Sequence, residues 1–186
     1  MKPIRLLLTL FLTLFLLPAC GARNVGNAQN EWMVYHAASN STVNPSFPPY
    51  SFEYPSDWTI DESANHITFA SDAKLLKNVP EKLKSGQIIA GLSMNVNMSP
   101  EEMVSTYSCT LGSMIHFGNI ISFFVNGHPA AYQEGVNPET GDQLFIVATD
   151  IGRNTRGLLT SRIAEGELEL WKEILFQIAQ SLQVEQ

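Results

Sequence analysis

The strongest hydrophobic pattern in the chain is an apolar run near its start, residues 6–17, which only two threonines interrupt. Lys2 and Arg5 precede it. A helix of that length would span about 18 Å, which is short of the ~30 Å hydrocarbon core of a bilayer. Because a positive start followed by a short apolar run is typical of an export signal, we expect residues 1–19 to be a signal peptide.

The run ends in Leu17-Pro18-Ala19-Cys20, which resembles the lipobox of bacterial lipoproteins. In that family a lipid is attached to the cysteine, and cleavage just before it makes it the first residue of the mature protein. The resemblance implies an extracytoplasmic protein that Cys20 anchors to a bacterial membrane. Several acyl chains together give stable anchoring, whereas one is marginal. The alternative is an ordinary secretory signal that is cut elsewhere.

Residues 20–49 have no regular hydrophobic period, because asparagine, serine and proline interrupt it. We interpret this segment as a lipidated N-terminus followed by a flexible tether. Its exception is the apolar group Trp32-Met33-Val34-Tyr35. We favour docking of this group on the protein's own domain, with docking on another molecule as the alternative.

From Tyr50 to Val184 the pattern predicts a single folded domain. Strands are expected where apolar and polar residues alternate or where short apolar runs end at turn residues. The Asn126-Gly127 pair suits a tight hairpin turn. The predicted strands cover residues 50–54, 59–61, 67–71, 88–97, 120–125, 130–135, 144–151 and 156–163.

Two segments follow the helical period instead. Ser99, Pro100 and Glu102 form a capping-box start, after which Met103, Tyr107, Leu111 and Met114 recur at helical spacing. The last helix is expected to begin near Glu165, with glutamates at the positive end of its dipole. Phe176 lies outside the apolar face of that helix, so we expect it to be exposed. Both helices are predicted to pack on the sheet.

The order of these elements, together with Phe52-Glu53-Tyr54-Pro55-Ser56-Asp57-Trp58 and Asn126-Gly127-His128-Pro129-Ala130, resembles the PsbP-like superfamily. The resemblance implies an α+β fold with a central antiparallel β-sheet and helices packed on both faces, an α/β/α sandwich. Members of that superfamily include an extrinsic photosystem II subunit, a nuclear factor that binds the small GTPase Ran and many bacterial lipoproteins. It therefore implies a binding or accessory protein rather than an enzyme, and it assigns no functional residues.

Charge and cysteine content narrow the class further. Without the signal, nine basic residues remain against 18 acidic ones, a net charge of −9. This balance repels phosphate backbones, so we expect no nucleic acid partner. If Cys20 is acylated, Cys109 is left alone and no internal disulfide forms. We expect Cys109 to be a buried, unreactive thiol, because no cation near it in the sequence lowers its pKa.

The sequence shows no recognisable catalytic or cofactor motif. The histidines at 36, 66, 116 and 128 lack the spacing of metal ligands, and no glycine-rich phosphate loop occurs. Glu139 and Asp142 share a turn, where we interpret them as solvated charges because their spacing matches no calcium loop. We therefore predict no metal, no cofactor and no enzymatic activity.

One segment, residues 72–86, differs from the acidic background. It carries Lys74, Lys77, Lys82 and Lys84, with leucines at roughly helical spacing that Pro80 interrupts. One interpretation is an insertion whose leucines pack on the sheet while the lysines are solvated. The other is a contact site for anionic lipid or an acidic partner.

Two function classes follow. The first is a membrane-anchored binding or accessory module, whose partners would be the membrane through Cys20 and a protein. The second is a small-ligand-binding or weakly enzymatic envelope protein with a pocket between helix and sheet. A deep apolar pocket with convergent polar groups favours the second, and a shallow surface with an exposed patch favours the first. The sequence leaves the oligomeric state open.

Overall fold

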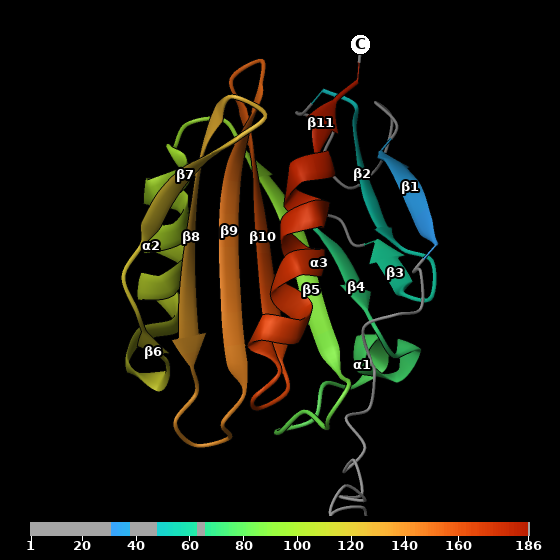
Figure 1. The fold of residues 1–186 in the computed structure, drawn as a ribbon, viewed down its shortest axis with the longest axis vertical. Coiled ribbons are helices and arrows are strands. Elements are labelled where there is room, and N and C mark those ends of the chain that lie inside the picture. Colours follow the sequence, from blue (N-terminus) through green and yellow to red (C-terminus); the bar gives the residue numbers. More distant parts are fainter. Residues whose placement is uncertain (1–30, 38–47, 63–65, 186) are drawn as a thin grey trace, which may run out of the picture.

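The computed structural model describes residues 31–37, 48–62 and 66–185. Cys20 and most of the predicted tether lie outside them. The largest unit is an eight-stranded sheet whose strand pairs are all antiparallel (Figure 1). Its order is β3 (Thr59–Glu62), β4 (Ile67–Ala70), β5 (Ile88–Asn95), β10 (Thr155–Ile163), β9 (Gln143–Gly152), β8 (His128–Val136) and β6 (His116–Phe117), with β7 (Ile121–Val125) also paired to β8.

A second, three-stranded sheet lies beside the first. It consists of β1 (Trp32–Ala37), β2 (Tyr50–Pro55) and β11 (Gln183–Val184). We had expected one central sheet, so the placement of residues 50–54 in it was wrong. Strand β2 pairs with the two ends of the described chain instead. No local pattern identifies such partners, because they lie far away in the sequence.

Docking of the apolar group at residues 32–35 on the domain is confirmed. Trp32 and Tyr35 pack against the core, while Met33 and Val34 are half exposed. Burial raises the pKa of the Tyr35 hydroxyl, and its hydrogen bond to Glu62 raises that pKa further. The same two causes, burial and the Glu62 charge, raise the pKa of Tyr50 to about 12. These contacts join β1 to β3 as well as to β2.

The helices are α1 (Ala73–Lys77), α2 (Pro100–Leu111) and α3 (Leu168–Ser181), with a short 3₁₀ turn at Gly112–Met114. The predicted capping box of α2 is confirmed in both directions between Ser99 and Glu102. Helix α3 begins at Leu168 rather than near Glu165. Within the described ranges, no helix has both the length and the apolar content to cross a membrane.

The hairpin turn between β7 and β8 is also as predicted. Asn126 and Gly127 both have positive φ, 51° and 81°, which is the backbone conformation of a tight two-residue hairpin turn. Asn126 also donates its side-chain amide to the carbonyl of Gln180 at 2.9 Å. The turn therefore connects the hairpin to the end of α3.

Helix α3 covers the main apolar core. Its Trp171, Leu175 and Ile178 pack with Val147 of β9 and Leu159 of β10. Figure 1 shows α3 in front of the sheet, to the right of β9. Phe176, which we expected to be exposed, is partly buried and makes edge-on contacts with three rings. The three rings belong to Phe123 of β7, Tyr132 of β8 and Phe145 of β9.

Helix α2 packs on different residues of the same strands. Its Met103 and Val104 contact Ile146 and Ala148 of β9 and Leu158 of β10. These positions alternate with those that contact α3, and successive side chains of a strand point to opposite faces. The expected α+β fold with a largely antiparallel sheet is therefore confirmed.

Candidate functional site

One depression in the described surface lies on the face of the sheet that α2 covers only in part. It is an open groove of about 520 Å³, which we call the β5 groove. Its lining includes Thr68, Ile89, Gly91, Ser93, Tyr107 and Thr160.

The groove exists because α2 is short relative to the sheet. The helix packs mainly on β8 and β9 and less on β10. On the α2 side, β4 and β5 therefore remain half exposed at Thr68, Gly91 and Ser93. Tyr107 and Leu111 of α2 form one wall of the groove. Small and hydroxyl-bearing residues form its floor, so the floor lies low.

A second depression of about 210 Å³ continues the groove along α2. The two share Ser93 and Tyr107, and the second is also lined by Met98 and Met103. Methionine side chains are flexible and polarizable, so this end of the surface adapts to different apolar shapes. Together the two depressions follow β5 from Ile89 to Asn95.

The other end of the groove meets the segment that carries the four lysines, residues 72–87, which we call the lysine segment. Leu75 and Leu83 of this segment are buried against Ala70 and Ala164, next to Ile89 in the groove. This is the packing that the insertion interpretation predicts. The side chains of Lys74, Lys77, Lys82 and Lys84 are all exposed.

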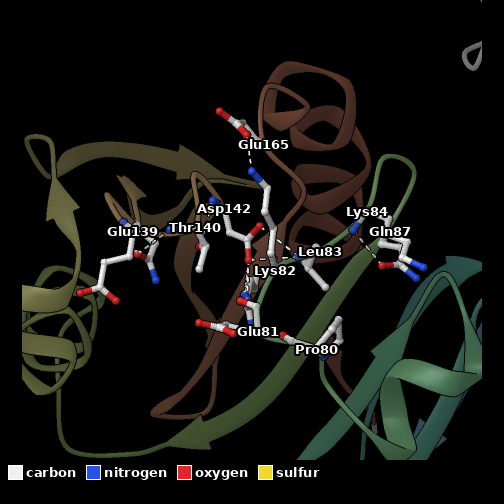
Figure 2. A network of polar contacts seen from close by, with 12 residues as sticks. Pro80, Glu81, Lys82, Leu83, Lys84, Gln87, Glu139, Thr140, Asp142 and Glu165 are labelled. Carbon is white, nitrogen blue, oxygen red and sulfur yellow. Dashed lines mark hydrogen bonds and ion pairs between the residues drawn. The ribbon is translucent and has the colours of Figure 1, made fainter.

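A buried carboxylate fixes the lysine segment to the sheet. Asp142 is completely buried and accepts hydrogen bonds from the Leu83 amide at 3.2 Å and from Arg162 Nε at 2.6 Å. Arg162 also donates Nη1 to the carbonyl of Pro80 at 3.1 Å and Nη2 to that of Glu81. Figure 2 shows Asp142 beside Leu83 within this network.

Our interpretation of Asp142 as a solvated turn charge was therefore wrong, whereas Glu139 in the same turn is exposed. A buried charge is tolerated when it is paired and hydrogen-bonded. Asp142 meets both conditions only because β10 and the lysine segment converge on it. The sequence signal that could have identified it was Arg162, a cation between Ser161 and Ile163 within a predicted strand.

The loop between β10 and α3 contributes two more carboxylates. Lys82 Nζ lies 2.6 Å from Glu165, and this bond lowers the pKa of the Glu165 carboxyl. Burial raises the pKa of Glu167, but hydrogen bonds from Ser85, Gly86 and Trp171 outweigh burial and lower it overall. Glu165 and Glu167 therefore bind the lysine segment instead of serving the helix dipole alone.

These contacts divide the predicted cations into two groups. Lys82 is paired with Glu165 (Figure 2), whereas in the described part of the chain Lys74, Lys77 and Lys84 form no ion pair. The three unpaired lysines sit on a segment that Leu75 and Leu83 hold against the sheet. The structure thus holds three exposed lysines on a segment whose leucines pack beside Ile89 of the groove.

The remaining sequence candidates do not assemble into a site. Cys109 is exposed, so our expectation of a buried thiol was wrong: its position on α2 faces away from the cluster formed by Met103 and Val104. His36 bonds Glu185 at 2.5 Å, at the edge of the small sheet. Within residues 31–37, 48–62 and 66–185, no three histidine, cysteine or acidic side chains are grouped as a metal site would require.

The second function class placed a pocket between helix and sheet, but sequence reasoning did not identify β5 as its floor. The available signal was Gly91, since an isolated glycine inside a strand often marks the close approach of another group. A Cβ at Gly91 would lie 3.5 Å from Thr160 Oγ1, an ordinary contact, so the glycine is not required by packing. It keeps the floor of the groove low.

Solved structures share this arrangement of strands and helices. No protein-family model and no curated protein sequence matches the chain. The solution structure of cyanobacterial PsbP (CyanoP) from Synechocystis sp. PCC 6803 matches with a TM-score of 0.54 and 11% identity, over 86% of this chain and 96% of that one. The fold is PsbP-like. The predicted PsbP-like domain is thus confirmed at the level of the fold.

Two further matches have lower TM-scores. LpqN of Mycobacterium tuberculosis, described as involved in cell envelope biogenesis, has a TM-score of 0.48 and 12% identity, over 84% of this chain and 93% of that one. PA94 of Pseudomonas aeruginosa is a protein of unknown function described as a putative regulator. It has a TM-score of 0.43 and 13% identity, over 84% of this chain and 99% of that one.

Proposed function

We propose that this protein is a membrane-anchored, extracytoplasmic binding or accessory module without catalytic activity. A lipid on Cys20 holds it at a bacterial membrane, and the β5 groove with the lysine segment is its binding surface. The observation that carries the proposal is the position of this open surface, which lies on a firmly packed sheet and shares Ile89 with the leucine cluster of the lysine segment.

The shape of the groove supports a binding role. An open groove with a sheet as its floor exposes its occupant to solvent on one side, whereas a site for chemistry on a small substrate encloses it. Arg162 is the one permanently charged side chain of the lining, and Asp142 and two carbonyls already engage it. The lining otherwise offers hydroxyls, aliphatic groups and a histidine.

The second function class, a small-ligand-binding envelope protein, is supported by one observation. The groove lies between helix and sheet, where that class predicted a pocket, and its size is typical of ligand sites. We infer, in addition, that α2 and α3 form the outer layers of the predicted α/β/α sandwich, because they contact alternating residues of β9 and β10. Both classes use the same surface.

The anchor is tested by changing Cys20→Ser in the full-length protein. We expect the variant to move from the membrane fraction to the soluble extracytoplasmic fraction, since removing the acyl chains removes the membrane affinity. A signal peptide cut elsewhere would leave the wild-type protein soluble and the variant unchanged. Either result would contradict the anchored form of the proposal.

The binding surface is tested by cross-linking in cells. A photo-reactive residue at Ser93, in the groove, is compared with one at Ser122, which is exposed on β7 outside it. We expect capture of a defined lipid or protein at Ser93 alone. Equal labelling at the two positions would argue against a binding role for the groove.

A further inference from the structure

We propose that the β5 groove binds the apolar chain of an anionic single-chain amphiphile taken from the membrane, and that Lys74, Lys77 and Lys84 hold its acidic head group. This inference rests on the proposed function and names the ligand class of the same surface.

The floor of the groove favours an apolar chain over a peptide. Strand β5 is paired on one side with β4 and on the other with β10, so its backbone has no free edge for strand addition. Contacts to a ligand must therefore come from side chains. Ile89, Tyr107 and Leu111 offer apolar surface, and Gly91 leaves the space above the strand open.

The length of the groove fits a single acyl chain. From Ile89 to Asn95 the strand extends about 20 Å. An extended lipid chain spans half of the ~30 Å hydrocarbon core, about 15 Å. The depressions along this path, of about 520 and 210 Å³, share Ser93 and Tyr107 and so lie next to each other. Met98 and Met103 line the far end, where a chain tip of variable length would lie.

The charges place the head group. The groove's own cation, Arg162, is neutralised by buried Asp142 and is not available. The acidic residues nearest in the chain are Asp72, which caps α1, and Glu81, whose carbonyl accepts from Arg162. Lys82 is paired with Glu165. The ammonium groups that form no ion pair in the described structure are those of Lys74, Lys77 and Lys84, on the segment that closes the Ile89 end of the groove.

The fixed backbone of the lysine segment also supports the assignment of its lysines to the head group. Leu75 and Leu83 are almost fully buried, and Asp142 ties the Leu83 amide to β10. The lysines therefore lose little backbone entropy when they bind an anion. The protein as a whole is acidic, so an anion is attracted only where cations are grouped. The acyl chains of Cys20 carry no acidic head, which is why the lysines point to a separate membrane lipid.

The test uses the full-length lipidated protein in phosphatidylcholine vesicles with photoactivatable lysophosphatidylglycerol or lysophosphatidylcholine of the same chain. We expect the anionic probe to label peptides from β5 and α2, several-fold more than the zwitterionic probe. Gly91→Leu, which fills the groove, should reduce labelling at least about tenfold, since the chain is excluded. Ser122→Leu, on an exposed strand outside the groove, is the matched control and should leave labelling unchanged.

A second variant tests the head group. Reversing Lys74, Lys77 and Lys84 to Glu while keeping Lys82 should reduce labelling by the anionic probe at least about tenfold, because each lysine near an anionic lipid contributes attraction. It should leave labelling by the zwitterionic probe nearly unchanged. Circular dichroism of each variant confirms that it is folded.

Three results would overturn the inference. They are wild-type labelling outside β5 and α2, undiminished labelling of folded Gly91→Leu, and strong labelling of Cys20→Ser where the wild type is unlabelled. The last would show that the protein's own acyl chains fill the groove. Each of these three results leaves the proposed function intact. The proposed function fails only if Cys20→Ser stays in the membrane fraction or if a photo-reactive residue at Ser93 captures nothing specific in cells.

Discussion

The two faces of the eight-stranded sheet are built differently. On the α3 face, Leu175 and Ile178 pack into an uninterrupted core with Val147 and Leu159, and aromatic side chains fill its edges. On the α2 face, Met103 and Val104 cover β8 and β9, while β4 and β5 stay half exposed. The difference shows that α3 covers its face of the sheet more completely than α2 covers the other.

The largest expected effect is the loss of stability when a leucine on the α3 face is truncated, compared with one on the α2 face. Leu175→Ala should lower the free energy of unfolding by about 2–5 kcal/mol, because a fully buried leucine leaves a cavity. Leu111→Ala, at the half-buried wall of the groove, should cost under about 1 kcal/mol. Urea denaturation of both variants measures the difference. Equal losses would mean that the two faces are equally packed.

The next effect concerns Asp142, which holds the lysine segment against the sheet. Asp142→Ala should destabilise by about 3 kcal/mol, because it leaves Arg162 without its buried partner, although that guanidinium is partly exposed. The same change should raise the hydrogen exchange rate of the Leu83 amide, because that amide donates a hydrogen bond to the Asp142 carboxylate. Glu139→Ala, in the same turn but exposed, is the control. Unchanged exchange at Leu83 would show that the lysine segment is held without Asp142.

Two glycines in paired strands provide a matched contrast. A Cβ at Gly157, on the α3 face, would collide with Leu182 Cδ2, so Gly157→Ala should cost about 1–3 kcal/mol through overpacking. A Cβ at Gly91, on the other face, meets only ordinary contacts, so Gly91→Ala should be neutral or stabilise by up to about 1 kcal/mol. Thermal denaturation distinguishes them. A large loss at Gly91 would mean that its face is already filled.

The smallest effect is a pH dependence at the loop that holds the lysine segment. The pKa of Glu167 in the folded protein lies below its ordinary value of 4.5. Its contribution to stability is therefore complete above that value and is lost as the pH falls through the lowered pKa. Glu167→Gln should be less stable than wild type at pH 6, and the gap should close toward pH 3. Exposed Glu173→Gln should show no such change, which urea denaturation at each pH will test.

Much of the fold was predictable because its signals are local. The Ser99 capping box, the Asn126-Gly127 turn and the apolar run of β9 each depend on residues within a few positions of one another. The start of α3 was placed too early, because Glu165 and Glu167 were interpreted as helix residues. They bind Lys82 and Gly86 instead, more than 80 positions away.

The candidate site was predictable only in part. The lysines and the leucines beside them were recognised from composition and period, and the structure separates them into solvated and buried groups. The carboxylate that fixes them, Asp142, was misinterpreted, because turn residues are usually solvated. Its burial depends on Arg162, 20 positions away, and Arg162 in turn reaches Pro80, 82 positions away.

The sequence by itself determined the acidic charge, the capping box of α2 and the positions of most strands of the large sheet, since each is written in composition or short-range period, and it predicts an export signal and a lipid-attachment cysteine. Tertiary structure decided that β2 joins a separate sheet, that Asp142 is buried and that the β5 groove exists. A 12-residue helix cannot cover an eight-stranded sheet. Which strands it leaves exposed depends on long-range pairing, which local patterns do not encode.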